Sequence, residues 1–129
     1  APLRNIAASR IVYLADSEQD AIEDLRPSVT YETSVQEQRG FLEMLKNVLG
    51  LEVPNDRTAI DAYVEQGYYI LGDSDTVTRK LRKFYDESGG FGSLLIVTGK
   101  DWATRKKRHR SMRLFMERVA PELRDLDPA

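Results

Sequence analysis

Four residues stand where two predicted parallel strands end, and their types suit a ligand pocket. Asp16 follows the run Arg10–Ala15, which is rich in β-branched and aromatic residues, and Thr98, Asp101 and Trp102 end or follow the apolar run Ser93–Thr98. In parallel α/β folds, the residues that leave the carboxyl ends of the strands lie on the functional face. An indole can wall an aromatic pocket. We therefore predict Asp16, Thr98, Asp101 and Trp102 as substrate-pocket residues.

Two of these residues also have a purely structural interpretation. Trp102 precedes the last predicted helix and is equally well explained as a hydrophobic staple that holds this helix. Asp16 belongs to an acidic cluster that continues through Glu18, Asp20, Glu23 and Asp24. We interpret this cluster as helix capping and a solvated face, because carboxylates are favourable in the first turn of a helix.

Other catalytic and cofactor chemistries find no support in the sequence. His109 is the only histidine, it lies among arginines and lysines, and no Ser or Cys nucleophile with an acid partner accompanies it. Cysteine is absent, so carboxylates alone remain as metal ligands, and we predict no metal site. The run Gly89–Gly92 follows a helix and precedes a strand, opposite to the order that aims N–H groups at phosphate, and is predicted to be a turn. We assign no catalytic or cofactor-binding residue.

The clearest structural unit runs from Tyr68 to Trp102. Gly72–Thr76 offers short capping side chains, and Val77, Leu81 and Phe84 follow at helical spacing. Gly89 and Gly90 end that helix, and Ser93–Thr98 is a continuous apolar run typical of a strand covered on both faces. The pattern predicts an α/β fold with parallel strands.

The remaining elements read from the same signals. A short helix, which Ser17 would cap together with Asp20 three residues on, is predicted to stop before Pro27. A second helix begins at the capping box of Ser34 and Glu37 and ends before Gly50, and a third follows Thr58. We predict one domain over residues 1–129, in which residues 33–67 form an inserted, lid-like helical segment. The last helix spans about Thr104 to Leu123, and Pro121 is placed to kink or end it.

Composition sets the broad class. The chain has 129 residues, of which 41% are hydrophobic and 31% charged, and it is too short for a complete (β/α)₈ barrel of ~250 residues. It has no apolar run long enough for a membrane span, its start lacks the apolar core of a signal peptide, and with no cysteine we expect a cytoplasmic location. The positive charge gathers between Lys100 and Arg113, which we interpret as a solvated helix face rather than a nucleic-acid site.

Several of these runs together resemble a known family. Gly72–Val77, Gly89–Gly92, Asp101–Trp102, Arg110–Met112 and Val119–Pro121 are similar to the carboxy-terminal part of the luciferase-like flavin-dependent monooxygenases, nearest the limonene-monooxygenase-like branch. Ser74 stands where the family usually has proline, a mild departure because proline there only presets φ.

The resemblance implies the fold and chemistry of that family. The expected fold is the carboxy-terminal portion of a (β/α)₈ barrel, with few parallel strands and several helices. The expected chemistry is oxygenation of a small organic substrate by dioxygen and reduced FMN, with a flavin reductase as the partner that would supply the reduced flavin. Most flavin-binding residues of the family lie on earlier strands, so we expect the isolated chain to be inactive.

Two alternatives remain open. The first is a non-catalytic interaction or oligomerisation module derived from a barrel end, since an exposed parallel edge favours partner binding. The second is nucleic-acid binding through Lys100–Arg113, against which the acidic overall balance counts. Whether it is a barrel fragment or a barrel-derived module, we expect the chain to form a homo-oligomer, because two strands cannot close a barrel. The expected apolar interface includes the strand Leu94–Val97 or the helix Phe41–Leu49.

Overall fold

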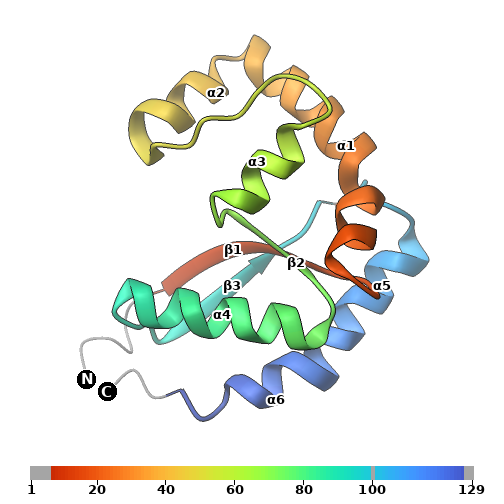
Figure 1. Cartoon of the computed structure of the whole chain (residues 1–129), viewed down its shortest axis with the longest axis vertical. Helices are drawn as coiled ribbons and strands as arrows, with labels where there is room; N and C mark the ends of the chain where they lie inside the picture. Colours follow the sequence, from red (N-terminus) through yellow and green to blue (C-terminus); the bar gives the residue numbers. More distant parts are fainter. Residues whose placement is uncertain (1–6, 100, 127–129) are drawn as a thin grey trace.

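The computed structural model describes residues 7–99 and 101–126 of the chain, which form a three-stranded parallel sheet with helices on both faces (Figure 1). Lys100 and the ends of the chain lie outside the described residues. In chain order the elements are β1 (Ala7–Leu14), α1 (Glu18–Gln38), α2 (Phe41–Met44), the π-helical turn η2 (Leu45–Leu49), α3 (Ala59–Glu65), β2 (Tyr69–Gly72), α4 (Ser74–Ser88), β3 (Ser93–Val97), α5 (Arg105–Leu114), the π-helical turn η3 (Phe115–Val119) and α6 (Ala120–Leu123).

The order of strands across the sheet is β2-β1-β3, so the central strand is the first in sequence. The carboxyl half of β1, from Ile11 to Leu14, pairs with β2, and the stretch from Ala7 to Ile11 pairs with β3. Helices follow each of the first two strands along the chain, α1 to α3 after β1 and α4 after β2, and both β2 and β3 pair in parallel with β1. The segment 33–67 contains the end of α1 together with α2, η2 and α3, and its role as an inserted lid stays a prediction. The predicted α/β class with parallel strands is confirmed.

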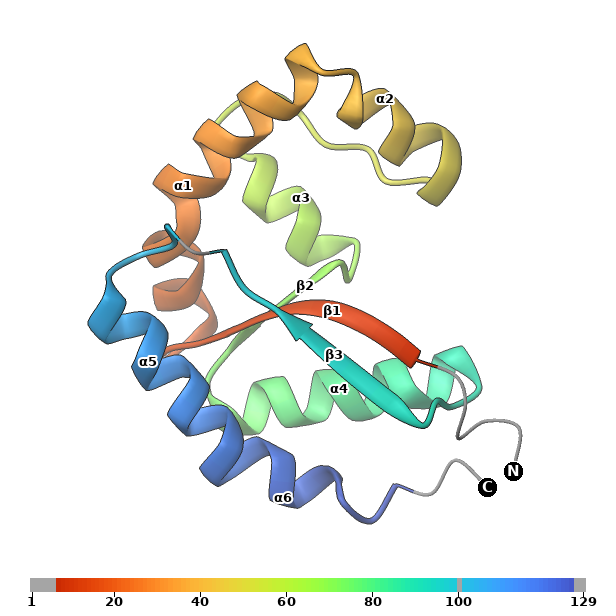
Figure 2. The same ribbon diagram turned by 180° about the vertical axis from the view of Figure 1, so that it is seen from behind.

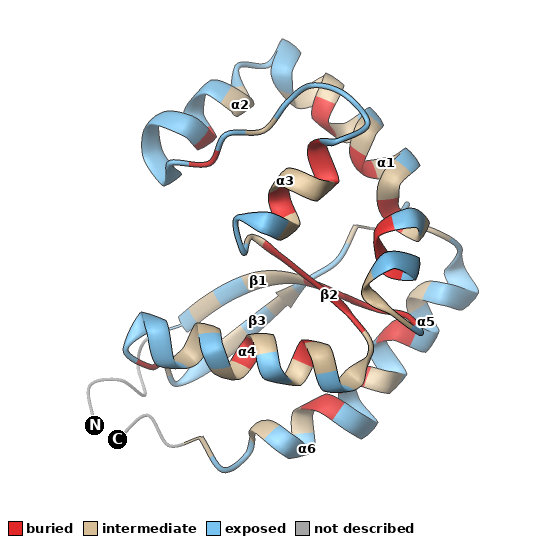
Figure 3. Cartoon of the chain, in the orientation of Figure 1, coloured by how far each residue is buried: buried red, intermediate tan, exposed pale blue. Residues whose placement is uncertain are grey.

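Two apolar clusters hold the layers together, one on each face of the sheet. Val12 and Leu14 point to the face covered by α4, α5 and η3, where they meet Val77, Leu81 and Phe115. Tyr13 and Leu71 point to the other face, which α1 and α3 cover. Figures 1 and 2 show α1, α2 and α3 on the side of the strands opposite to α4 and α6. Strand β2 is buried along its whole length (Figure 3).

The predicted helix ends are confirmed where they depend on local hydrogen bonds. The Asp73 carboxylate accepts from the Thr76 N–H at 3.1 Å and begins α4, and Gly89 ends it with φ at 83°. Ser17 Oγ accepts from the Asp20 N–H at 3.0 Å and begins α1. Thr104 Oγ1 accepts from the Lys107 N–H at 3.2 Å and begins the last helix.

The predicted helix boundary at Pro27 is wrong. Helix α1 continues through this exposed proline to Gln38, and Ser34, the predicted start of a new helix, lies inside α1 and donates from its hydroxyl to the Tyr31 carbonyl. An interior proline costs ~3 kcal/mol. The buried stripe of Leu25, Val29 and Thr33 continues past it, and burial of this stripe offsets the lost backbone hydrogen bond.

The predicted burial of the third strand is also wrong. Leu94 and Ile96 are partly buried under α5 and η3, whereas Leu95 is 63% exposed and Val97 40% exposed. Strand β3 lies at the edge of the sheet. Helices α1 and α3 cover β1 and β2, but they do not reach the face of β3 that carries Leu95 and Val97, called its inner face below. A continuous apolar run therefore has only one covered face here.

Pro121 falls at the start of α6 and does not end the helical run. A proline ring clashes with the carbonyl four residues earlier in a regular helix. The wider turn η3 ends two residues before Pro121, and such turns relax the local hydrogen-bond ladder. In the described residues, no helix is both long and apolar enough to cross a membrane.

Candidate functional site

Trp102 lies at the junction between the loop that follows β3 and the inserted helices. It is 3% exposed, and its ring centroid is 5.6 Å from that of Tyr69, which stacks in turn on Tyr63 at 4.5 Å. Its indole Nε1–H donates to Glu32 Oε1 of α1 at 3.0 Å. Trp102 therefore packs inside the apolar cluster with residues of α1, α3 and β2.

Asp16 lies on the rim of a polar cavity at the end of β1. Its carboxylate accepts from Arg110 Nη2 at 2.7 Å. Deeper in, Tyr13 Oη donates to Asp24 at 2.8 Å, and Lys107 Nζ donates to the other oxygen of Asp24 at 2.9 Å. Burial and the hydrogen bond to Asp24 raise the pKa of Tyr13, so its phenol stays protonated.

This polar cavity has a volume of about 250 Å³ and an acidic lining. The lining residues are Tyr13, Leu14, Ala15, Asp16, Asp20, Glu23, Asp24, Lys107 and Arg110. Two basic side chains face four carboxylates, and both cations are already engaged by carboxylates of the chain. Such a lining disfavours an anionic group.

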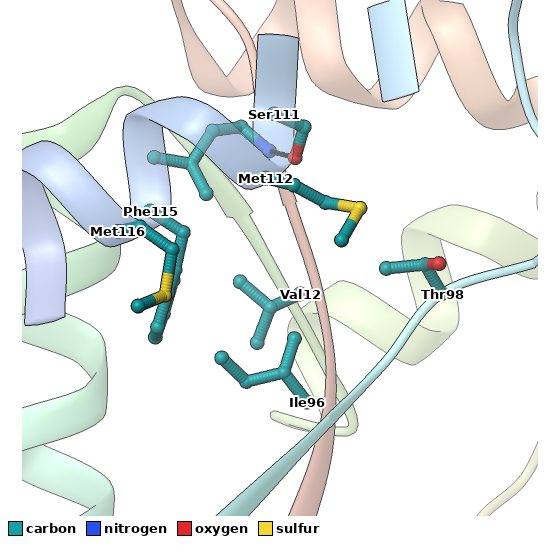
Figure 4. Close-up of a pocket in the computed structure, with 8 residues that line it drawn as sticks. Val12, Ile96, Thr98, Ser111, Met112, Phe115 and Met116 are labelled. Atoms are coloured by element: carbon teal, nitrogen blue, oxygen red, sulfur yellow. Dashed lines mark hydrogen bonds between the residues drawn. The ribbon is translucent and has the colours of Figure 1, made fainter. Parts of the chain in front are cut away.

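Thr98 lines a second, apolar cavity of about 170 Å³ between the sheet and the last helix (Figure 4). Val12 and Ile96 form one side of the cavity, and Met112 and Met116 form the other. The buried Ser111 Oγ accepts from the Leu14 N–H at 2.8 Å. At this height β3 has diverged from β1, and the serine satisfies a backbone donor that has no strand partner on that side.

Asp101 contributes its backbone rather than its exposed carboxylate. Its carbonyl oxygen accepts from Ser28 Oγ of α1 at 3.2 Å. The structure thus places Thr98, Asp101 and Trp102 on one loop, with Asp16 on the neighbouring strand exit. It distributes Asp16 and Thr98 over two different cavities and buries Trp102 in the core, and whether these four residues contact a substrate stays a prediction.

Two residues that matter at this face were not singled out from the sequence. Ser111 lies in the run Arg110–Met112 that carried the family resemblance, but nothing local indicated that it would bond to β1. Glu32 is an ordinary helix glutamate in sequence. Its contact with Trp102 spans 70 positions, so no local pattern reports it.

The FMN that the resemblance implies does not fit either of the two cavities that Asp16 and Thr98 line. Sites for ligands of this size have volumes of about 300–1,000 Å³, which exceed both the apolar and the polar cavity. The acidic rim around Asp16 also disfavours a phosphate group. The described residues contain no group of three or more metal-ligating side chains.

Comparisons with known proteins identify monooxygenases among the relatives of this chain. The chain is 27% identical over 123 residues to limonene 1,2-monooxygenase of Rhodococcus erythropolis. This match covers 93% of this chain and 29% of that enzyme. It is 31% identical over 114 residues to 4-hydroxyprotoasukamycin monooxygenase of Streptomyces nodosus subsp. asukaensis, a match that covers 85% of this chain and 28% of that enzyme. No protein-family model matches the chain.

A solved structure shares the fold. The oxygenating constituent of 3,6-diketocamphane monooxygenase from the CAM plasmid of Pseudomonas putida, a type II Baeyer–Villiger monooxygenase in complex with FMN, superposes with a TM-score of 0.63 and 22% sequence identity. The match covers 90% of this chain and 33% of that structure. The chain thus spans less than a third of the length of the two enzymes it matches in sequence.

Proposed function

We propose that this chain, which is similar over most of its length to flavin-dependent monooxygenases, forms the carboxy-terminal part of the barrel of such an enzyme. In this role it supplies a few parallel barrel strands and the predicted inserted segment of residues 33–67. The complete enzyme would oxygenate a small organic substrate.

The position of α1 and α3 is the observation that carries this proposal. These helices pack against Tyr13 and Leu71, in the carboxyl halves of β1 and β2, and against Ala15, which follows β1. In a parallel barrel this end of the strands carries the active site. These helices therefore border the face on which a substrate would bind, where a covering segment excludes water from the reaction.

FMN and the residues of this chain would have different roles in the complete enzyme. FMN, when bound, supplies the oxygenation chemistry through its reaction with dioxygen, and a flavin reductase would keep it reduced. The residues of this chain would help to position the substrate and to cover the site. Trp102 fixes the loop after β3, and the buried side chains of α1 cover the face of the sheet to which Tyr13 points. Strands outside this chain must supply most of the flavin contacts.

A chimeric enzyme tests this proposal directly. This chain would replace the matching segment of the Rhodococcus limonene 1,2-monooxygenase, and the chimera should bind FMN and oxygenate limonene when supplied with reduced flavin. This chain alone should bind FMN only weakly in a fluorescence titration, since positioned cofactor contacts are missing. A chimera that folds cooperatively but binds no FMN contradicts the proposal. So does stoichiometric, submicromolar FMN binding by this chain alone.

A second function, as an interaction module, is favoured by the edge of the sheet. Strand β3 carries no charged residue, proline or bulge, which are the devices that keep exposed edges from pairing. Leu95 and Val97 are exposed on its inner face, and Met112 and Met116 are exposed beside it on the last helix.

We expect the isolated chain to self-associate through this edge. Light scattering coupled to size exclusion at micromolar concentration should show a dimer or larger assembly. Leu95→Lys should shift the chain towards monomer, because it places a charge on the exposed edge without disturbing the core. Val48→Lys, at an exposed apolar position of η2, is the matched control and distinguishes the edge of the sheet from the predicted helical interface. A stable monomer with a cooperative melt argues against this function.

A further inference from the structure

The apolar cavity between the sheet and the last helix opens where β1 and β3 part. Strand β3 pairs with β1 only as far as Ile11, so beyond this residue β1 has no strand partner on that side. Val12 and Ile96 form the wall of the cavity that belongs to the sheet, and the last helix forms the other wall (Figure 4). The cavity therefore lies on the face that α4, α5 and η3 cover, opposite to the face that α1 and α3 cover.

Ser111 is the buried polar side chain of this cavity, with only 4% of its surface exposed. Its Oγ accepts from the Leu14 N–H. Other helical hydroxyl groups, those of Thr30, Thr33 and Thr78, donate to the carbonyl four residues earlier. Among the described residues Ser111 has no such acceptor, so its hydroxyl hydrogen is free to turn towards the cavity. A buried donor without an acceptor is costly, and an acceptor atom in the cavity would remove this cost.

The volume and lining of the cavity suit a small apolar ring. The cavity measures about 170 Å³, and an apolar cavity of about 150 Å³ is large enough to bind benzene. A bound water molecule needs two to four polar partners, whereas Ser111 is the only buried polar side chain among the lining residues. Met112 and Met116 are exposed at the mouth, and methionine side chains adapt their shape to what they contact. The lining therefore favours an organic molecule over water.

The last helix is irregular where it borders the cavity. Helix α5 ends at Leu114, and the π-helical turn η3 begins with Phe115 and Met116, which both line the cavity. Single π-helical turns inside α-helices occur frequently at functional sites. The widened turn and the hydroxyl of Ser111 are thus two independent features of the same cavity.

We propose that this cavity binds a neutral, ring-sized organic molecule that carries one hydrogen-bond acceptor. The ring lies between Val12 and Ile96 on one side and the two methionines on the other, and the acceptor atom accepts from the Ser111 hydroxyl. A charged ligand is disfavoured, because the lining has no charged side chain to compensate for the lost hydration. The site is separate from the polar cavity of Asp16 and depends neither on a flavin nor on the proposed oxygenase role.

Pyridine and benzene are matched test ligands, because they share the shape of the ring and only pyridine carries an acceptor. Both are titrated against the ¹⁵N-labelled chain in mildly alkaline buffer, in which pyridine is neutral. Leu95→Lys is the background for every sample, because it should keep a second copy from covering the mouth of the cavity. Leu95 faces away from the cavity that Ile96 lines, since neighbouring residues of a strand point to opposite faces.

We expect saturable shifts of the amide resonances of the lining residues with both ligands, and the largest shifts with pyridine at Leu14 and Ser111. The absence of saturable shifts at these residues with pyridine overturns the site. Shifts confined to the aromatic cluster around Trp102 overturn it as well, because they would place the ligand on the other face of the sheet.

Ser111→Cys tests the role of the hydroxyl. The sulfur can still accept from the Leu14 N–H, but its S–H is only a weak donor. Pyridine should bind this variant roughly 2–10-fold more weakly, the usual worth of one hydrogen bond, and the affinity for benzene should change little. An equal change in the affinities for both ligands contradicts the proposed hydrogen bond.

Ile96→Phe tests the location by adding volume inside the cavity, and saturable binding of both ligands should be lost. Leu94→Phe is the matched control, because Leu94 lies two residues earlier on the same face of β3 but outside the lining. This variant should bind both ligands as before. Unchanged binding by an Ile96→Phe variant whose amide spectrum shows the native fold overturns the placement of the ligand in this cavity. If Ile96→Phe does not fold, the shifts at Leu14 and Ser111 and the Ser111→Cys comparison still decide the proposal.

Discussion

Trp102→Ala is expected to lower the free energy of unfolding by about 3–5 kcal/mol, the usual cost of removing a large buried aromatic side chain. The indole is 3% exposed and touches Tyr69, and its N–H is bonded to Glu32. Such a loss is a large share of the ~5–15 kcal/mol that stabilises a typical domain. Urea denaturation followed by circular dichroism measures it, provided that the slope of the transition is unchanged.

Two further variants separate the contributions at this position. Trp102→Phe keeps an aromatic ring in the cluster but removes the N–H, and should cost less than the alanine variant by several kcal/mol. Leu95→Ala, at an exposed position of β3, should change stability by no more than ~0.5 kcal/mol. A loss at Trp102 as small as that at Leu95 would show that the indole is dispensable to the core and restore its interpretation as a pocket wall.

Gly99→Ala is the second substitution with a large expected effect. The added methyl group would lie 2.3–2.5 Å from three atoms of the Trp102 ring, far inside van der Waals contact. The ring is held by Tyr69 and Glu32, so relief requires movement of the loop or of the indole. Overpacking of this kind costs about 1–3 kcal/mol. Thermal melts of the wild type and the variant at the same pH give the difference.

A double-mutant cycle assigns that cost to its cause. In the background of Trp102→Ala the new methyl group has room, and Gly99→Ala should then be close to neutral. The interaction energy between the two sites should equal most of the single-variant loss. An undiminished effect of Gly99→Ala in the double variant would place the cost in the backbone of the loop and not in the contact with the ring.

The unit from β2 to β3 was largely predictable from the sequence because its signals are local. The Asp73 cap joins atoms three residues apart, and Gly89 ends α4 through its own backbone conformation. The apolar stripe of α4 needs only the helical period to be recognised. For the same reason the Ser17 cap and the start of the last helix at Thr104 were predicted correctly.

The placement of candidate residues at the strand exits was predictable only in part. The rule that parallel strands present their carboxyl ends on one face located Asp16 and the loop from Thr98 to Trp102, but it says nothing of side-chain direction. Asp16 is paired with Arg110, and Trp102 turns inward towards Glu32. Partners so far apart in sequence are chosen by the packing of whole elements.

Tertiary structure alone decided the features that depend on sums over many contacts. Helix α1 continues through Pro27 because a long buried stripe outweighs one lost hydrogen bond. Strand β3 exposes Leu95 because its position at the edge of the sheet, beside β1 and not β2, leaves that face without a covering layer. The sequence by itself determined the element ends that local caps and turns make, such as those at Ser17, Asp73, Gly89 and Thr104, since these signals act within a few residues. The order of the strands, the burial of each face and the Glu32–Trp102 contact were decided by the fold, because long-range pairing is settled only when all layers compete for the same apolar surface.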